Sequence, residues 1–302
     1  MKSLTRALTL GIAFVTLYSC SSNSGSNKKD DILAGQLPVI IDESVLPIIL
    51  EQKDVFESSY TNATILPLPK PEVSAINALI GGEAATAVLT RELNETEKRT
   101  FEQRSIKPKI YKIAYDGIVL VGNRESRDTS FVINDVISIL DGKNVRNTKL
   151  VFENLNSSVF RYFKDLGKLD KVANTYVEAK KTSEEVLEEI SSNKDKVGLI
   201  SYNQYLSLES SFTKKDKIRI LSVLNDSLPE GKFIKPSQAS LSTGEYPLKR
   251  EILVLNYQAN HGLGIGFSAF MTGDRGQRIV LKSGLLPATM PGREIIIRDR
   301  IN

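Results

Sequence analysis

The sequence predicts an α/β protein in which a parallel or mixed sheet is covered by helices. From residue 37 onward, short runs of β-branched and aliphatic residues alternate with longer segments whose apolar residues recur at helical spacing. Of the 302 residues, 41% are hydrophobic and 25% are charged, which is the composition of a chain with a packed core and not of a disordered one. This length predicts two lobes or one large one.

Residues 1–19 have the pattern of a secretory signal peptide. Lys2 and Arg6 precede an uncharged run over residues 8–17 that is too short to span a bilayer. The run ends in Leu17-Tyr18-Ser19-Cys20, which resembles the lipobox of bacterial lipoproteins, although Tyr18 replaces the usual small residue. We expect Cys20, the only cysteine, to carry a lipid such as palmitate. The alternative is a soluble secreted protein with a cysteine near the cleavage site by chance.

Residues 20–36 are predicted to form a lipidated, flexible tether, because residues 21–31 are polar and nearly devoid of apolar groups. Loss of residues 1–19 would leave 283 residues and lower the formal charge from +4 to +2, since Lys2 and Arg6 are removed. This small charge does not predict a nucleic-acid partner. The expected location is the periplasm or cell envelope, with membrane attachment through the lipid alone.

Three predicted strands each end in polar residues just before a helix. The strands cover residues 37–41, 84–89 and 149–152, and the polar residues are Ser44, then Thr90 and Arg91, then Asn156, Ser157 and Ser158. The first amides of a helix lack intrahelical partners and, with the helix dipole, attract anions. An oxyanion site is one interpretation; in the other, Ser44, Thr90 and Asn156 merely cap their own helices.

The sequence contains one cysteine and one histidine, so neither an internal disulfide nor a Cys/His zinc site is expected, and we predict no metal or cofactor. His261 is the only imidazole, and it has no serine and aspartate partners at a recognisable motif spacing. The neighbouring Gly262, Gly264 and Gly266 lack the spacing of a dinucleotide loop and predict a turn that enters a helix.

Five segments, in order, resemble the periplasmic solute-binding proteins of the phosphate-binding family that serve ABC transporters. They are the strand at residues 115–123 with its Asp-Gly step, the helix at 134–140 followed by Asp141-Gly142-Lys143, the strand at 196–202, the return crossing Tyr246-Pro247-Leu248-Lys249-Arg250, and the helix pair within 267–287.

The resemblance implies a bilobal type II fold, with two mixed-sheet lobes joined by two crossings. Lobe 1 would comprise residues 37–115 and 249–302, and lobe 2 residues 116–248. Such a protein is expected to be a monomer that binds a solute between the lobes and presents it to ABC permease subunits without catalysis. Family members hold phosphate with helix amides, Ser/Thr hydroxyls, an arginine and a carboxylate that accepts the phosphate proton.

Two of the family's phosphate-binding loops match this sequence at least in part. In the first, over residues 42–45, Ser44 is retained, but Asp42 and Glu43 stand where the family usually has Gly, Ser or Thr. The second, Thr90-Arg91-Glu92-Leu93, matches the pattern ser-arg-x-leu, so Arg91 is the expected anion clamp.

The third loop departs from the family most. Its pattern, arg-x-x-gly-ser-gly-thr-arg, falls on residues 152–159, and the arginine and glycine positions hold Phe152, Leu155, Ser157 and Val159. The ligand is therefore expected to be phosphate or a similar small oxyanion. Its expected contacts are Ser44, Thr90, Arg91, Asn156, Ser157 and Ser158.

Other interpretations remain open at this point. Asp42, Glu43 and Glu153 near the expected cleft favour a degenerate binding-protein fold that acts as an envelope interaction module, or that binds a non-phosphate ligand such as a peptide or a cation. An acid/base enzyme would use Glu43 and Glu153 as a carboxylate pair. Arg161 is expected to be solvated on its helix face.

Overall fold

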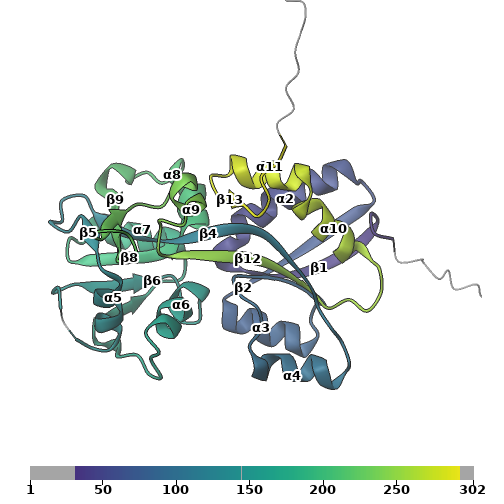
Figure 1. Ribbon diagram of the computed structural model, residues 1–302, viewed down its shortest axis with the longest axis horizontal. Coiled ribbons are helices and arrows are strands. Elements are labelled where there is room, and N and C mark those ends of the chain that lie inside the picture. Colours follow the sequence, from purple (N-terminus) through teal and green to yellow (C-terminus); the bar gives the residue numbers. More distant parts are fainter. Residues whose placement is uncertain (1–30, 144, 293–302) are drawn as a thin grey trace, which may run out of the picture.

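The computed structural model describes residues 31–143 and 145–292, so residues 1–19 and Cys20 lie outside the described part. Two halves lie side by side, and strands β4 and β12 run between them (Figure 1). The main sheet has ten strands and continues from one half into the other in the order β2-β1-β3-β12-β4-β8-β6-β7, with β9 and β13 also paired to β4. This is the bilobal α/β architecture with two crossings.

Lobe 1 contains the half of the sheet in which β1 pairs in parallel with both β2 and β3. Its strands are β1 (Gly35–Asp42), β2 (Ala63–Lys70) and β3 (Thr86–Leu89), and its helices are α2 (Leu46–Ser59), α3 (Glu72–Gly81), α4 (Glu95–Gln103), α10 (Leu263–Thr272) and α11 (Asp274–Lys282), with the 3₁₀ turn η1 (Glu43–Val45) after β1 and the short strand β13 (Leu286–Pro287) after α11. The β-branched residues of β1 are fully buried, which is typical of a strand covered on both faces.

Lobe 2 contains the other half of the sheet, where β6 pairs in parallel with β7 and β8. Its elements are β5 (Ser130–Phe131), α5 (Ile133–Leu140), β6 (Lys149–Phe152), α6 (Ser158–Leu166), η2 (Asn174–Tyr176), β7 (Val177–Ala179), α7 (Ser183–Ser192), β8 (Lys196–Ser201), α8 (Tyr202–Glu209), η3 (Lys215–Lys217), β9 (Ile218–Ile220), β10 (Ser222–Asn225), β11 (Lys232–Ile234) and α9 (Gln238–Ser242). A small separate sheet joins β11, β10 and β5.

The crossings are β4 (Lys109–Asn123) and β12 (Lys249–Asn256). Residues 109–117 of β4 pair antiparallel with β12, whereas residues 118–122 pair with β8. One strand therefore serves both lobes. Its Asp116 stands opposite Arg250 of β12, so the two crossings meet at a pair of opposite charges.

The predicted elements agree closely with the structure where the sequence pattern is local. Strand β6 has the predicted bounds, and α5 begins one residue before the predicted helix at 134–140. Helix α4 begins with a capping box between Asn94 and Glu97. The tether prediction is wrong at its end, because Gly35 and Gln36 already pair with β2. The exact lobe boundaries, 115/116 and 248/249, stay predictions. Within the described ranges, no helix is long and apolar enough to cross a membrane.

Candidate functional site

A buried ion pair joins the two crossings. The Nε and Nη2 of Arg250 donate to Oδ2 of Asp116 at 2.9 and 2.8 Å, and Asp116 has no exposed surface. Asp116 also accepts hydrogen bonds from the Ser201 hydroxyl at 2.9 Å and the Asn203 amide at 3.0 Å. With these partners, the Asp116 carboxylate has all its hydrogen bonds from within the chain. The remaining N–H groups of the Arg250 guanidinium point away from Asp116.

The N–H groups of Arg250 that point away from Asp116 face two serine hydroxyls, one from each lobe. Nη2 donates to Ser44 Oγ at 2.9 Å, and Nη1 donates to Ser158 Oγ at 2.8 Å. The two hydroxyl oxygens lie 3.0 Å apart, and both serines are buried. The structure therefore brings Ser44 and Ser158 together, although 114 residues separate them in the sequence.

Local structure explains how each serine reaches this point. The Ser44 amide donates to Asp42 Oδ1 at 3.0 Å, which makes Asp42 the cap of η1 and places Ser44 inside the turn. Ser157 caps α6 by accepting a hydrogen bond from the Phe160 amide at 3.2 Å, so Ser158 is the first residue of that helix. The interpretation of Ser44 and Asn156 as helix caps is therefore wrong: Asp42 and Ser157 have that role.

Two further polar atoms at this edge of lobe 1 have no hydrogen-bond partner. Oδ2 of Asp42 and Oγ1 of Thr90 are both fully buried and unsatisfied. Asp42 is the last residue of β1 and Thr90 directly follows β3, so both lie where these neighbouring parallel strands end, at the same edge of the sheet. A buried polar atom without a partner costs free energy, so these two atoms are positioned to gain from a ligand. Thr90 does not cap α4, because Asn94 does.

Glu153 lies in the contact between the lobes, which we call the seam, with 8% of its surface exposed. Gln204 donates through Nε2 to Glu153 Oε1 at 3.0 Å and, across the seam, to the Glu43 carbonyl at 3.2 Å. Burial, reinforced by the charges of Glu43 and Asp42, raises the pKa of Glu153 to about 7. Burial and the Asp42 charge also raise the pKa of Glu43.

The hydrogen bonds around Glu153 are consistent with a bound proton. Ser183 Oγ lies 3.1 Å from Glu153 Oε2 and 2.8 Å from Gln204 Oε1, so its single hydrogen faces two acceptors. A proton on Glu153 Oε2 would be donated to Ser183 Oγ, and the Ser183 hydrogen would then serve Gln204. Ionised Glu153 leaves one of these contacts without a hydrogen.

Arg91, the expected anion clamp, is occupied by carboxylates of the chain. Its Nε donates to Glu72 Oε1 at 2.6 Å, and Nη1 and Nη2 donate to the two oxygens of Glu97 at 2.7 and 2.9 Å. Burial lowers the pKa of Arg91, but Glu97 and Glu72 outweigh this and raise it above its ordinary value. Arg91 therefore carries a positive charge, and the carboxylates of Glu72 and Glu97 balance that charge.

Arg161 is not the solvated residue expected from its helix position. Its Nε donates to Glu72 Oε2 at 2.8 Å, and Nη1 donates to Asp165 at 2.6 Å. The Glu72 side chain is 1% exposed. Arg161 is shielded from solvent by a tertiary contact, because the start of α3 in lobe 1 lies against α6 in lobe 2.

The remaining expected contacts do not face the serine pair. Asn156 is exposed; its amide bonds Asn154 at 2.8 Å, and its carbonyl accepts from the Val73 amide at 3.3 Å. The Ser157 hydroxyl donates to the Asn154 carbonyl at 2.6 Å. Phe152, which occupies the position of a family arginine, is fully buried in the core and does not reach the site.

Sequence reasoning missed Arg250, Asp116 and Glu72 as site residues. Arg250 and Asp116 both lie in segments that carry the family resemblance, and opposite charges in two crossing strands are a detectable signal. Glu72 follows Pro71 at the start of α3, where an acidic residue is common, so its burial was not foreseeable.

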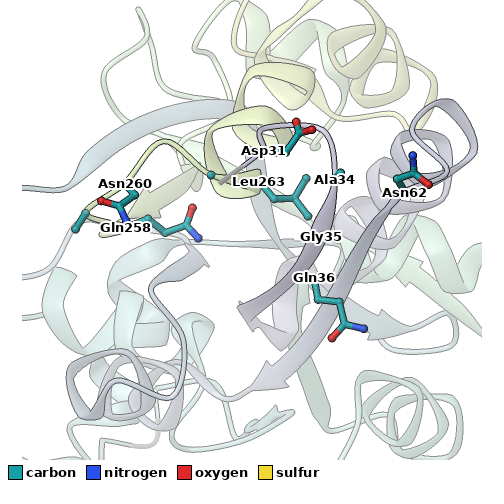
Figure 2. Close-up of a pocket in the computed structure, with 10 residues that line it drawn as sticks. Asp31, Ala34, Gly35, Gln36, Asn62, Gln258, Asn260 and Leu263 are labelled. Carbon is teal, nitrogen blue, oxygen red and sulfur yellow. The ribbon is translucent and has the colours of Figure 1, made fainter. Parts of the chain in front are cut away.

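A cavity of about 730 Å³ lies elsewhere, at the beginning of β1. Figure 2 shows Gln36, Asn62, Gln258 and Asn260 around it, and the charged side chain of Asp31 also lines it. Ser44 follows the other end of β1, seven strand steps away, which is roughly 23 Å. The cavity is therefore separate from the serine pair.

The glycines beside this cavity are explained by packing. A Cβ at Gly264 would lie 2.3 Å from Gln258 Oε1, and a Cβ at Gly266 would lie 1.7 Å from the Ile32 carbonyl oxygen. As predicted, the segment enters a helix, since Gly262 is the N-cap residue of α10. Across residues 31–143 and 145–292, no group of three or more His, Cys, Asp or Glu is arranged to hold a metal ion.

Comparison with known proteins agrees with this architecture. The model of the PBP superfamily domain matches residues 34–275. The phosphate-binding protein PstS of Staphylococcus haemolyticus is 24% identical over 261 residues, covering 80% of this chain and 78% of that protein, and PstS of Staphylococcus epidermidis is 22% identical over 258 residues, covering 80% and 75%.

Solved structures give the same result for the fold. A Clostridium perfringens protein assigned as a phosphate ABC transporter substrate-binding protein, with phosphate bound, superposes with a TM-score of 0.68 at 17% identity, over 84% of this chain and all of the other. An ABC-type phosphate transport receptor from Vibrio cholerae gives 0.64 at 17% identity, with the same coverage. These relatives are substrate-binding proteins and not enzymes. Because the family model spans most of the chain, this protein belongs to the PBP superfamily of bilobal binding proteins.

Proposed function

We propose that this chain is a lipid-anchored, extracytoplasmic solute-binding protein that captures phosphate or a similar small oxyanion between its lobes and presents it to an ABC permease. The observation that carries the proposal is the convergence of Ser44, Ser158 and Arg250. One hydroxyl from each lobe meets a buried guanidinium that belongs to a crossing strand. An anion held by all three would draw the lobes together.

The present contacts at this point can be exchanged for contacts with a ligand. Arg250 donates to two neutral hydroxyl oxygens, and a phosphate oxygen is a stronger acceptor than either. Both hydroxyls can turn their hydrogens toward a bound anion. If the lobes separate, Ser44 moves away from Ser158 while Arg250 stays with Asp116, so one edge of the guanidinium becomes available.

The acidic groups of the seam favour a ligand that still carries protons. The charge of Arg250 is balanced by Asp116, while Asp42 and Glu43 add negative charge nearby. Asp42 Oδ2 is buried without a partner and can accept a hydrogen bond from a P–OH group. Phosphate retains a proton at neutral pH, whereas sulfate has none to donate, so this arrangement favours phosphate over sulfate.

Membrane attachment and delivery are supported by the sequence and by the relatives. The pattern of residues 1–20 favours export and lipidation at Cys20, and the relatives include phosphate-binding and phosphate transport proteins. The expected partners are the ligand and the permease subunits, and the expected form is a monomer.

Titration calorimetry on the protein lacking residues 1–20 tests the binding step. We expect heat with phosphate and at least tenfold weaker binding of sulfate. The same titration is carried out with molybdate and tungstate, which makes four anions in all. The absence of heat with all four anions at millimolar concentration would eliminate oxyanion capture.

A second candidate is favoured by one observation: Arg91, the clamp expected from the family motif, is paired with Glu72 and Glu97. A binding-protein fold whose arginine is occupied by its own carboxylates could instead act as an envelope interaction module. Failure of all four anions to bind, together with recovery of an envelope protein by crosslinking in cells, would favour that candidate.

A further inference from the structure

Glu72 is a carboxylate in an unusual place. It is the first residue of α3 in lobe 1, and it is fully buried, with its carboxylate bonded to two arginine side chains. Both of its oxygens are used: Oε1 accepts from Arg91 of lobe 1, and Oε2 accepts from Arg161 of lobe 2. One carboxylate thus binds one guanidinium from each side of the seam.

The charges around Glu72 leave no excess of positive charge for a solute. Arg91 is also paired with Glu97, and Arg161 is also paired with Asp165. Two guanidinium groups therefore face three carboxylates. An incoming anion would have to displace Glu72 from both arginines, and the displaced carboxylate would need to reach water.

The contacts beside Glu72 link the same two elements. The amide of Val73, the next residue of α3, donates to the Asn156 carbonyl at 3.3 Å, just before α6 begins. In Figure 1, α3 and α6 lie on the same side of the molecule, one in each lobe. The ion pair is therefore part of a local junction between the lobes, distant in sequence from the crossings.

We infer that Glu72 is an internal anion that takes the place of a ligand between Arg91 and Arg161 and holds the lobes together when no solute is bound. Separation of α3 from α6 leaves Arg161 without Glu72 and exposes a carboxylate that is buried in the joined state. Such an ion pair opposes opening because breaking it leaves one charge incompletely paired. This inference concerns the ligand-free protein and does not depend on the identity of the solute.

The distance between the lobes is the direct test. The full chain, purified in detergent with Cys20→Ser, would carry spin labels at Arg99→Cys on α4 and Leu166→Cys on α6, both of which are exposed positions. Without phosphate, we expect one short distance in the otherwise unaltered protein. Glu72→Gln should raise the ratio of separated to joined lobes at least about tenfold, which corresponds to about 1.4 kcal/mol.

Asp165→Asn is the matched control, because it removes one carboxylate from Arg161 without removing a bond across the seam. We expect it to change the ratio less than about twofold. Arg161→Gln should open the lobes as Glu72→Gln does, and the double variant should open them no further, because both changes remove one interaction. Arg161→Gln also provides the answer if Glu72→Gln does not fold.

Unchanged distances in both Glu72→Gln and Arg161→Gln would overturn the inference, and so would an equal shift in Asp165→Asn. Addition of phosphate separates this test from the proposed function. If phosphate returns the opened Glu72→Gln protein to the short distance, both hold. If the lobes open but phosphate does not close them, the role of Glu72 stands and phosphate capture fails.

Discussion

Arg250 and Arg91 are both paired with carboxylates, but they differ in what else they contact. Arg250 has one carboxylate partner and directs its remaining donors at two hydroxyls, whereas Arg91 directs its donors at two carboxylates and the Glu92 carbonyl. A solute can compete with a hydroxyl far more easily than with a carboxylate. The availability of an arginine therefore depends on the charges that surround it, and a matching sequence motif does not establish it.

The largest expected effect concerns the carboxylate that supports Arg250. Asp116→Ala leaves a buried guanidinium without its counter-charge and removes the acceptor for Ser201 and Asn203. We expect the free energy of unfolding, measured by urea denaturation, to fall by about 3–5 kcal/mol. Asp165→Ala, which removes an exposed ion pair, should cost less than about 1 kcal/mol. If both variants lost a similar amount of unfolding free energy, the buried pair of Asp116 and Arg250 would stabilise the fold no more than an exposed ion pair does.

The second prediction uses the pH dependence of Glu153. Its pKa is about 7 in the folded protein, compared with about 4.5 for an ordinary glutamate, so the folded state holds a proton that the unfolded chain has lost between these values. The associated stability is fully present below pH 4.5 and is lost as the pH rises to 7, by an amount on the order of 3 kcal/mol.

Glu153→Gln removes the titrating group while retaining polar contacts to Ser183 and Gln204. Urea denaturation at pH 5, 6, 7 and 8 should show that the stability of the original protein, minus that of the variant, falls up to pH 7 and is constant above it. A difference that does not change with pH would show that Glu153 is ionised throughout.

The third prediction contrasts the two arginines directly. Arg250→Lys retains a positive charge beside Asp116 but loses the planar fork that reaches both serines. It should weaken phosphate binding about tenfold to a hundredfold, as expected for the loss of one charge-assisted hydrogen bond. Arg91→Lys should change the affinity less than about threefold. The reverse order, measured by calorimetry, would restore Arg91 as the anion clamp.

The smallest expected effects separate a binding hydroxyl from a capping hydroxyl. Ser44→Ala should weaken phosphate binding about fivefold, the equivalent of about 1 kcal/mol for one hydrogen bond. Ser157→Ala removes the cap of α6 and should lower the free energy of unfolding by about 1 kcal/mol while leaving phosphate affinity within about twofold. Calorimetry and urea denaturation on both variants distinguish the two roles. Equal losses of affinity would place Ser157 in the site.

The fold was more predictable than the site. Strand β6 and helix α4 depend on local patterns of apolar residues and on a capping sequence, so their bounds follow from the residues themselves. The site depends on contacts between distant segments: 206 residues separate Ser44 from Arg250, and 89 separate Glu72 from Arg161.

The family motifs pointed to Ser44 and Ser158, which the structure brings together, but they could not reveal which arginine faces hydroxyls and which faces carboxylates. The positions of the neighbouring carboxylates decide that, and the fold brings them together from several elements. Glu72 illustrates the difficulty, because a glutamate at the start of a helix is ordinarily a surface residue.

The contact between Gly266 and the Ile32 carbonyl has a consequence for orientation. Only a hydrogen atom fits at this position, so the chain leading to β1 lies directly against α10. If Cys20 carries the proposed lipid, the segment from residue 20 to residue 31 spans at most about 40 Å, and the α10 side of lobe 1 cannot move farther than that from the bilayer. Gly266 would thus help to keep the α10 side of lobe 1 within reach of the membrane.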